Sequence, residues 1–326
     1  MKGLLHRLLL GTGAMLYCLL GIQTAAAAQE RLELSGETLI STVTAYPPFA
    51  AFGRFLIPEQ LEGGQEGLRL KDLPELLLWH SDVQLSSTLE VLKYLQEHSL
   101  AGERIFYHFY TPQEVEDDSR KGETGFFFFR GKKGAPFAVL CSGGGFAYVG
   151  SLHGAMPHAM ELIKRGYNAF VLQYRTGSSE LAPAIDLARA LSYIFKHHEE
   201  LGVSVKNYSL WGASAGGKIA GNVVSYGTAD FKGDELPPPA AFIYEYSDYS
   251  EIGESEPPTY AITGDQDEIV FYQDVERRID LLKELGVPVK LRVCPGLGHG
   301  FGIGVGTVAA GWVDEAVTFW EEHSGH

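Results

Sequence analysis

The fold is decided by the stretch Tyr208-Ser209-Leu210-Trp211-Gly212-Ala213-Ser214-Ala215-Gly216. Its first part is apolar enough for a buried strand, and residues 215–225 show the spacing of a helix. The glycines and alanines around Ser214 leave little side-chain bulk, as a strained strand-to-helix turn requires. A Gly-x-Ser-x-Gly pattern is common by chance, and a glycine-rich helix start with Ser214 near the N-cap would also explain it. The strand before Ser214 and the helix after it favour an exposed, nucleophilic serine instead.

Short apolar runs alternate with helical patterns from about residue 124 onward. This alternation predicts the α/β class, with a mostly parallel central sheet and helices on both of its faces. Strands are expected at residues 125–130, 136–141, 167–174, 208–212, 240–246, 259–263 and 289–294. Helices are expected at residues 153–165, 181–198, 215–225, 269–285 and 307–322. Four successive phenylalanines at residues 126–129 are better explained by a buried strand than by a ligand platform.

Residues 29–103 do not follow this alternation, and we predict that they form an N-terminal extension to a catalytic domain at residues 104–326. Proline and glycine pairs interrupt the pattern, and helices are expected near residues 71–79 and 87–98. The extension either covers sheet edges or forms a lid over a substrate cleft. The charged residues 117–121 are expected to form an exposed turn that joins strands at 105–110 and 125–130 into an antiparallel hairpin.

The first 28 residues have the features of a signal peptide. Lys2 and Arg7 precede an apolar run over residues 8–22 that is short for a membrane span, and a run of small residues ends at Ala28. We therefore expect cleavage after Ala28, export to the periplasm or the medium, and no stable membrane insertion afterwards. An uncleaved membrane anchor is the alternative interpretation of the same residues.

The composition excludes several classes of partner. The formal charge is −15, and it moves to −17 without residues 1–28 because these hold two basic residues and no acid. So acidic a surface argues against nucleic acid and anionic lipid as partners. Cys141 and Cys294 lack the spacing of zinc ligands, and the glycine run at 302–306 lacks the strand, helix and acid of a dinucleotide site. Neither a metal nor an organic cofactor is therefore expected.

A serine hydroxyl needs a general base to become a nucleophile, and after a turn of this kind an acid and a histidine follow in chain order. Three carboxylates, Asp265, Asp267 and Glu268, follow the strand expected to end at residue 263. His299 follows the strand expected to end at residue 294. We interpret His299 as the general base and Asp267 as the acid that orients it, with Asp265 as the alternative acid.

The reaction also needs an oxyanion hole, which is a set of N–H groups aimed at the negative oxygen of the tetrahedral intermediate. The loop Ser142-Gly143-Gly144-Gly145-Phe146 follows an expected strand, and its glycines allow the backbone to approach a substrate closely. We predict that the N–H of Gly144 or Gly145 acts together with that of Ala215. A merely flexible turn explains three successive glycines less well.

These motifs resemble those of bacterial α/β-hydrolases of the acetyl-xylan-esterase and feruloyl-esterase-like type. The likeness covers about residues 104–322 and rests on Gly143-Gly144-Gly145-Phe146, Tyr174-Arg175, Gly212-Ala213-Ser214-Ala215-Gly216, Gly264 to Asp267 and His299-Gly300-Phe301-Gly302. The histidine that usually precedes the glycines is Ser142 here. This departure weakens the likeness to the hormone-sensitive-lipase branch and leaves the backbone oxyanion donors in place.

The resemblance implies an α/β-hydrolase fold and carboxylesterase activity through a Ser–Asp–His triad, with a small-molecule or carbohydrate ester, such as acetylated plant polysaccharide, as substrate. The same scaffold also hosts lipases, peptidases and non-catalytic binding relatives. A peptidase of this fold usually has a propeller or a larger cap, for which residues 29–120 are too short and too helical. A binding relative normally loses the serine or the histidine, whereas Ser214, Asp267 and His299 are all present. The sequence therefore predicts ester hydrolysis.

Overall fold

The computed structural model describes residues 30–58, 67–77, 79–80, 83–177 and 180–325. Residues Arg31–His326 cluster as one compact unit. The expected signal peptide at residues 1–28 lies outside the described residues, so its cleavage and the export of the chain stay predictions. Among the residues that are described, no helix is both long enough and apolar enough to cross a membrane.

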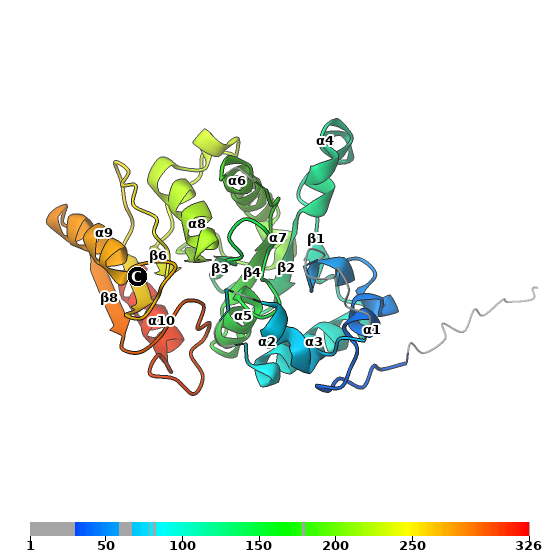
Figure 1. Ribbon diagram of the computed structural model, residues 1–326. Coiled ribbons are helices and arrows are strands. Elements are labelled where there is room, and N and C mark those ends of the chain that lie inside the picture. The colour runs from blue at the N-terminus through cyan, green and yellow to red at the C-terminus, as the bar shows by residue number, and fades with distance from the viewer. Residues whose placement is uncertain (1–29, 59–66, 78, 81–82, 178–179, 326) are drawn as a thin grey trace, which may run out of the picture. The chain divides into compact units, whose positions relative to one another are not determined.

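An eight-stranded sheet forms the centre of the unit, with the strand order β1-β2-β4-β3-β5-β6-β7-β8 (Figure 1). The strands are β1 (Phe106–Tyr107), β2 (Gly125–Phe129), β3 (Phe137–Cys141), β4 (Asn168–Gln173), β5 (Ser209–Ala213), β6 (Ala241–Glu245), β7 (Thr259–Gly264) and β8 (Val289–Cys294). β2 pairs antiparallel with β1 and with β4, and the remaining neighbours pair parallel. The mostly parallel sheet confirms the predicted fold class, and the pairing of β1 with β2 confirms that these two strands are antiparallel.

Helices cover both faces of the sheet, because its strands bury side chains on both sides. One face packs against α3 (Leu85–Leu100), α5 (Ala155–Lys164) and α10 (Trp312–His323), and the other against α6 (Leu181–Lys196), α8 (Ala215–Tyr226) and α9 (Tyr272–Glu284). Phe127 and Phe129 of β2 join the first core, whereas Phe126 and Phe128 join the second. All four are at most 1% exposed. The run of phenylalanines is therefore a buried strand, as predicted.

The segment before the sheet packs on the first of these faces through its own aromatic residues. Its short elements are α1 (Ile40–Thr44), α2 (Leu73–Leu76) and the 3₁₀ helices η1 (Pro47–Phe49), η2 (Gly53–Phe55) and η4 (Leu70–Asp72). Phe52 and Phe55 lie against Phe106 of β1, with ring centroids 6.5 and 5.0 Å apart. Phe52 also contacts Phe127 of β2 at 5.5 Å. The segment thus covers the sheet near its β1 edge, while the predicted domain boundary at residue 104 stays a prediction.

Two predictions of local structure differ from what is observed. The helix expected at residues 71–79 is replaced by η4 and the single turn of α2, because Pro74 fits only a first helical turn and Leu77 leaves the helix to enter the core. The turn expected at residues 117–121 is replaced by α4 (Pro112–Asp117) and η5 (Ser119–Glu123). Thr111 and Glu114 form a capping box that starts α4, a signal that was present in the sequence.

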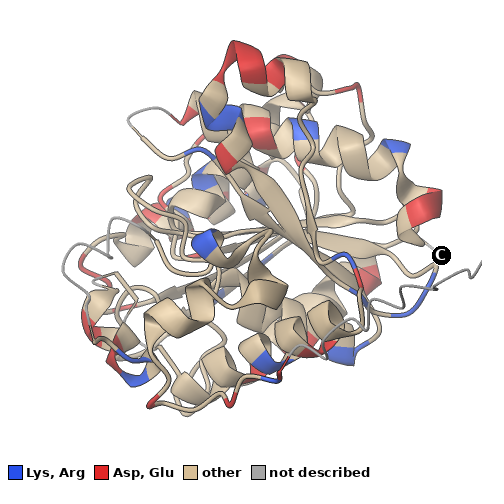
Figure 2. Ribbon diagram, turned by 90° about the vertical axis from the view of Figure 1, so that its right-hand side faces the viewer, with Lys and Arg blue, Asp and Glu red and all other residues tan. Residues whose placement is uncertain are grey.

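The sheet topology places the candidate residues at the carboxyl ends of the parallel strands. Figure 2 shows charged residues on the outer helices and loops, while the strands at the centre carry almost none. β3 lies between β4 and β5, so the chain changes direction across the sheet at this point. Open α/β sheets bind ligands beyond the carboxyl ends of the strands at such a switch point. The loops that follow β3, β5, β7 and β8 all emerge at these carboxyl ends, and they hold the residues singled out from the sequence.

Candidate active site

Ser214 occupies a sharp turn between β5 and α8. Its backbone has φ +52° and ψ −122°, a strained conformation for a residue with a side chain. Close packing requires the glycines around it: a Cβ on Gly212 would overlap the carbonyl of Gly216, and a Cβ on Gly216 would overlap the carbonyl of Cys141. The Ser214 N–H donates to the Glu245 carbonyl at 2.9 Å, which ties the turn to the end of β6. The partly exposed serine side chain therefore projects from a rigid backbone.

The structure brings Ser214, Asp267 and His299 together from three different loops. Oγ of Ser214 lies 2.9 Å from Nε2 of His299, and Nδ1 of His299 lies 2.7 Å from Oδ2 of Asp267. A carboxylate only accepts hydrogen bonds, so Nδ1–H of His299 donates to Asp267. Nε2 is then the acceptor for the Ser214 hydroxyl, which is the arrangement that a general base needs. Asp267 and His299 are buried, whereas Ser214 is partly exposed to solvent.

The geometry separates the two acids between which the sequence left a choice. Oδ1 of Asp267 accepts from the N–H groups of Ile269 and Val270 at 2.9 and 2.8 Å, which fixes this carboxylate. Asp265 instead accepts from the Gly296 N–H at 2.6 Å and so joins the loop after β7 to the turn after β8. The structure therefore places Asp267, and not Asp265, beside the histidine. The catalytic roles of the three residues stay predictions.

The glycine loop after β3 lies beside Ser214. Gly144 and Gly145 have φ of +135° and +56°, values that glycine adopts without strain. Within the described part of the chain their N–H groups have no hydrogen-bond acceptor, and Ala215 is the first residue of α8, where an N–H lacks an intrahelical acceptor. Gly143 comes closest to Ser214, because a Cβ there would lie 2.9 Å from the serine Cβ. The sequence analysis placed Gly143 in this loop but gave it no oxyanion role, and the oxyanion roles of Gly144, Gly145 and Ala215 stay predictions.

Ser142 fixes the start of this loop. Its Oγ accepts from the Ala155 N–H at 3.0 Å and donates to the Gly150 carbonyl at 3.2 Å. The hydroxyl of Tyr174 donates to the Ser142 carbonyl at 2.8 Å. All of these groups are buried, so the bonds are shielded from water. Ser142 therefore anchors the glycine loop to the start of α5 and to the end of β4.

A buried acid–histidine pair lies behind the three residues. Oε2 of Glu245 is 3.3 Å from Nε2 of His158, and both side chains are at most 4% exposed. Burial alone would lower the pKa of His158, but the Glu245 carboxylate and the carbonyl of Gly154 raise it above its ordinary value. The neighbouring Tyr246 packs its ring against His299, with centroids 4.8 Å apart. The sequence gives one sign of this buried pair: Glu245 is a carboxylate at the end of an apolar strand.

Two residues of the N-terminal extension reach the same loops. Trp79 stacks on Tyr148, which follows the glycine loop, with ring centroids 5.4 Å apart and planes at 2°. The carbonyl of Trp79 is so close to Gly300 that a Cβ there would overlap it. Nδ1 of His80 lies 3.2 Å from the Tyr148 hydroxyl, and the ring of His80 meets that of His153 edge to face at 4.3 Å. No local pattern in the sequence predicts contacts between segments so far apart.

The His80–His153 contact predicts a loss of stability in acid. Burial, followed by the charge of His299, lowers the pKa of His80 from 6.5 to about 4, and burial and His80 also lower the pKa of His153. Below pH 6.5 these histidines bind protons in the unfolded chain but not yet in the folded chain. The free energy of unfolding is therefore unaffected above pH 6.5 and falls below it, by up to about 1.4 kcal/mol per pH unit for each histidine. We expect His80→Asn to flatten this fall, as measured by urea unfolding between pH 7 and 4.5.

The matched control for this experiment is His108→Asn, because His108 is exposed and lies away from the glycine loop. The control should keep the pH dependence of the wild-type protein. An equally steep loss of unfolding free energy in the His80→Asn protein would contradict the assignment of this acid sensitivity to the buried pair.

Neither cysteine contacts the candidate triad. Cys141 at the end of β3 and Cys294 at the end of β8 are both free and buried, and burial raises the pKa of both thiols. Among the described residues, no three histidine, cysteine or acidic side chains gather closely enough to hold a metal ion. The groups that do converge at this edge of the sheet are a hydroxyl, an imidazole, a carboxylate and free backbone N–H groups.

Two family models match adjoining parts of the chain. The model described as BD-FAE matches residues 129–235, and the model of the prolyl oligopeptidase family matches residues 235–326. Ser214 falls in the first match, and Asp267 and His299 fall in the second. Each match covers less than half of the chain. No curated protein matches the sequence.

Solved structures are similar over most of their own length. An acetyl ester-xyloside bifunctional hydrolase from Caldicellulosiruptor lactoaceticus has 19% identity and a TM-score of 0.57, over 67% of this chain and 95% of that chain. A propionate-bound thermophilic esterase from Thermogutta terrifontis has 18% identity and a TM-score of 0.53, over 67% and 93%. A bacterial heroin esterase has 22% identity and a TM-score of 0.52, over 62% and 80%. The chain therefore has the α/β-hydrolase fold, and the resemblance drawn from its motifs is confirmed.

Proposed function

We propose that the protein hydrolyses carboxylic esters through an acyl-enzyme on Ser214. The observation that carries this proposal is the hydrogen-bonded line from Ser214 through His299 to Asp267, which runs beside a loop with free N–H groups. The fold of this chain is shared with structures named as esterases, which supports the same reaction. The arrangement supplies a nucleophile, a base, an orienting acid and electrostatic stabilisation, which are the requirements of acyl transfer.

In the first half of the reaction, Nε2 of His299 takes the proton of Ser214 as Oγ attacks the ester carbonyl carbon. The imidazolium that forms is stabilised by the Asp267 carboxylate. The carbonyl oxygen becomes negative, and N–H groups of Gly144, Gly145 and Ala215 donate hydrogen bonds to it. When the tetrahedral intermediate collapses, the bond to the alcohol oxygen breaks and His299 returns the proton to that oxygen.

In the second half, water replaces the alcohol. Nε2 of His299 takes a proton from the water molecule as its oxygen attacks the acyl carbon on Ser214. The same N–H groups hold the second oxyanion, and collapse releases the carboxylic acid while Oγ regains its proton. The ring of Tyr246 packs against that of His299, which favours one orientation of the imidazole through both halves.

Carbohydrate esters are the substrate class that we propose. One similar structure is named as an acetyl ester-xyloside hydrolase, and the model described as BD-FAE matches the segment that holds Ser214. The basic start, apolar run and small residues of residues 1–28 support export, which would bring the protein to ester-bearing polymers outside the cell. The net charge of −15 suits neutral substrates better than anionic ones.

Peptide hydrolysis is the second candidate, and the match of residues 235–326 to the prolyl oligopeptidase family favours it. That segment holds Asp267 and His299, and esterases and peptidases of this fold both use an acid and a histidine. The described part of the N-terminal extension consists of α3 and several short helices packed on the sheet, and it does not form the larger cap that a peptidase would need. Ester hydrolysis therefore stays the first candidate.

A panel of model substrates tests the proposal. We expect the mature protein to hydrolyse p-nitrophenyl acetate and acetylated xylan, and a quenched reaction with a slow ester to add the mass of one acyl group to the peptide that contains Ser214. Acyl chains from acetyl to octanoyl and a feruloyl ester then define the acyl preference. Faster cleavage of a prolyl peptide amide than of every ester would instead support the peptidase candidate.

A further inference from the structure

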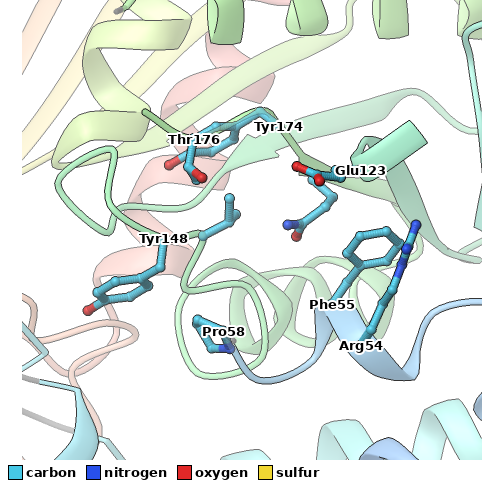
Figure 3. Close-up of a pocket in the computed structure, with 9 residues that line it drawn as sticks. Arg54, Phe55, Pro58, Glu123, Tyr148, Tyr174 and Thr176 are labelled. Carbon is cyan, nitrogen blue, oxygen red and sulfur yellow. The ribbon is translucent and has the colours of Figure 1, made fainter. Parts of the chain in front are cut away.

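Two features of this region take no part in the proposed reaction: an open cavity and a buried pair of titratable side chains. The cavity, of about 230 Å³, lies between Arg54 and Tyr148 (Figure 3), and none of the described residues that line it belongs to the candidate triad. The pair consists of Glu245, at the end of β6, and His158, of α5, with both side chains at most 4% exposed. The end of β6, unlike the cavity, contacts two members of the triad.

Two successive residues at the end of β6 make these contacts. The carbonyl of Glu245 accepts from the Ser214 N–H at 2.9 Å. The ring of Tyr246 meets the ring of His299 at 4.8 Å and that of Phe301 at 4.9 Å, both edge to face. The backbone of Tyr246 has φ +36°, a strained value for a residue with a side chain, so surrounding contacts must hold it in place. One short segment therefore touches both the candidate nucleophile and the candidate base.

The hydrogen-bonding groups of Glu245 and His158 require a proton between them. Nδ1 of His158 lies 2.8 Å from the carbonyl oxygen of Gly154, which can only accept, so Nδ1 carries a hydrogen. Nε2 of His158 lies 3.3 Å from Oε2 of Glu245, and neither atom has another partner among the described residues. Without a proton there, a nitrogen lone pair would face a carboxylate in a buried site, where unpaired polar groups cost most.

The surroundings place this proton on the histidine. Burial alone would lower the pKa of His158, but Glu245, the Gly154 carbonyl and Glu161 of the same helix raise it above its ordinary value. α10 presents the uncharged ring of Trp312, whose centroid is 5.4 Å from that of His158. An imidazolium donates from both ring nitrogens, so it satisfies the Gly154 carbonyl and the Glu245 carboxylate together.

The Glu245 carboxylate also acts on the hydroxyl of Tyr246. Burial, the charge of Glu245 and a hydrogen bond to its carboxylate raise the pKa of Tyr246 well above its ordinary value, so the hydroxyl stays protonated and donates to Glu245. The backbone N–H of Gly302 donates to the same hydroxyl. Gly302 lies three residues after His299, and its carbonyl accepts from Nε1 of Trp312 at 3.0 Å. The loop that carries His299 is thus tied to β6 through Tyr246.

We infer that Glu245 and His158 form an ionised positioning pair, which holds the ring of Tyr246 against the proposed general base His299. The inference rests on the proposed ester hydrolysis and adds to it two residues that are buried too deeply to meet the substrate. Apolar residues of similar volume often stabilise a fold as well as a buried charged pair does, so stability alone does not require these charges. Orientation of the imidazole is the task that their position supports.

Kinetics of two variants separate positioning from stability. Tyr246→Phe removes the hydroxyl and keeps the ring, and the double variant Glu245→Met with His158→Leu replaces the pair with apolar side chains. We expect both to lower kcat for p-nitrophenyl acetate on the order of tenfold and to leave KM within about twofold, because the imidazole loses alignment while the substrate site is kept. Tyr244→Phe is the matched control and should keep the wild-type rate. Tyr244 is equally buried on β6, but its ring stacks on Phe242 in the other core.

Nuclear magnetic resonance of ¹⁵N-labelled histidine tests the pair without turnover. Near pH 7, above the ordinary histidine pKa of about 6.5, both ring nitrogens of His158 should be protonated, and Glu245→Gln should leave a proton on Nδ1 alone. The Nδ1 proton of His299, which is bonded to Asp267, should exchange with water faster in Tyr246→Phe and in the double variant than in Tyr244→Phe. Thermal melts identify the variants that fold.

The two kinds of measurement distinguish the outcomes. Absence of turnover on every ester, with a doubly protonated His158 and the expected change in His299 exchange, would reject the reaction but keep the positioning pair. A neutral His158 in the wild-type protein would overturn the inference. So would wild-type kcat and wild-type His299 exchange in folded Tyr246→Phe and double-variant proteins, because the pair would then serve the fold alone.

Discussion

Ser214→Ala is expected to lower kcat for p-nitrophenyl acetate on the order of 10⁴-fold or more, while the fold is kept. Oγ of Ser214 is the atom that lies 2.9 Å from Nε2 of His299, and alanine removes it without adding bulk. In serine hydrolases the loss of the nucleophile leaves only the rate that the oxyanion groups and substrate binding provide. The measurement is steady-state kinetics on purified protein, with enough enzyme to detect a residual rate.

The fold should survive this change because the backbone of the turn is held by other groups. The Ser214 N–H bond to the Glu245 carbonyl involves no side chain of residue 214, and alanine is as strained at φ +52° as serine is. Circular dichroism and a thermal melt check this point, and both should match the wild-type protein. Turnover within tenfold of the wild-type value, in protein that melts normally, would reject Ser214 as the nucleophile.

The site could be predicted to the extent that its chemistry lies in local motifs. Ser214 is flanked by a strand and a helix that are both visible in the hydrophobic pattern, and His299 follows the last strand. The order of strands then brings the ends of β5, β7 and β8 to one edge, so the chain order of the motifs is enough to predict the convergence. The parallel sheet and the buried phenylalanine strand β2 follow from the same apolar periodicity.

What could not be predicted depends on contacts between segments that are distant in the sequence. Trp79 and His80 reach the glycine loop because the extension packs across the sheet, and no local pattern gives the direction of that packing. Glu245 faces His158 only because the fold brings the end of β6 to the side chain of a residue on α5. Each strand and helix follows from its own residues, whereas the support behind the site follows from how they are stacked.

Asp267→Asn is expected to lower kcat on the order of 10⁴-fold, and Asp265→Asn to lower it far less, on the order of tenfold or below. Asp267 accepts from Nδ1–H of His299 at 2.7 Å, and this bond keeps Nε2 free to accept the serine proton. An asparagine there can turn its NH₂ group toward the imidazole, which favours the tautomer with the proton on Nε2. That tautomer cannot take a proton from Ser214, so the loss falls on kcat rather than on KM.

Asp265→Asn serves as the matched control, since it makes the same chemical change two residues away. Asp265 accepts from the Gly296 N–H, and the amide oxygen of asparagine can still accept that bond. The loop that carries His299 should therefore stay in place and most of the rate should remain. Because tautomer exclusion acts only through the residue that contacts Nδ1, a larger loss of kcat in Asp265→Asn than in Asp267→Asn would mean that the acid of the working enzyme is Asp265.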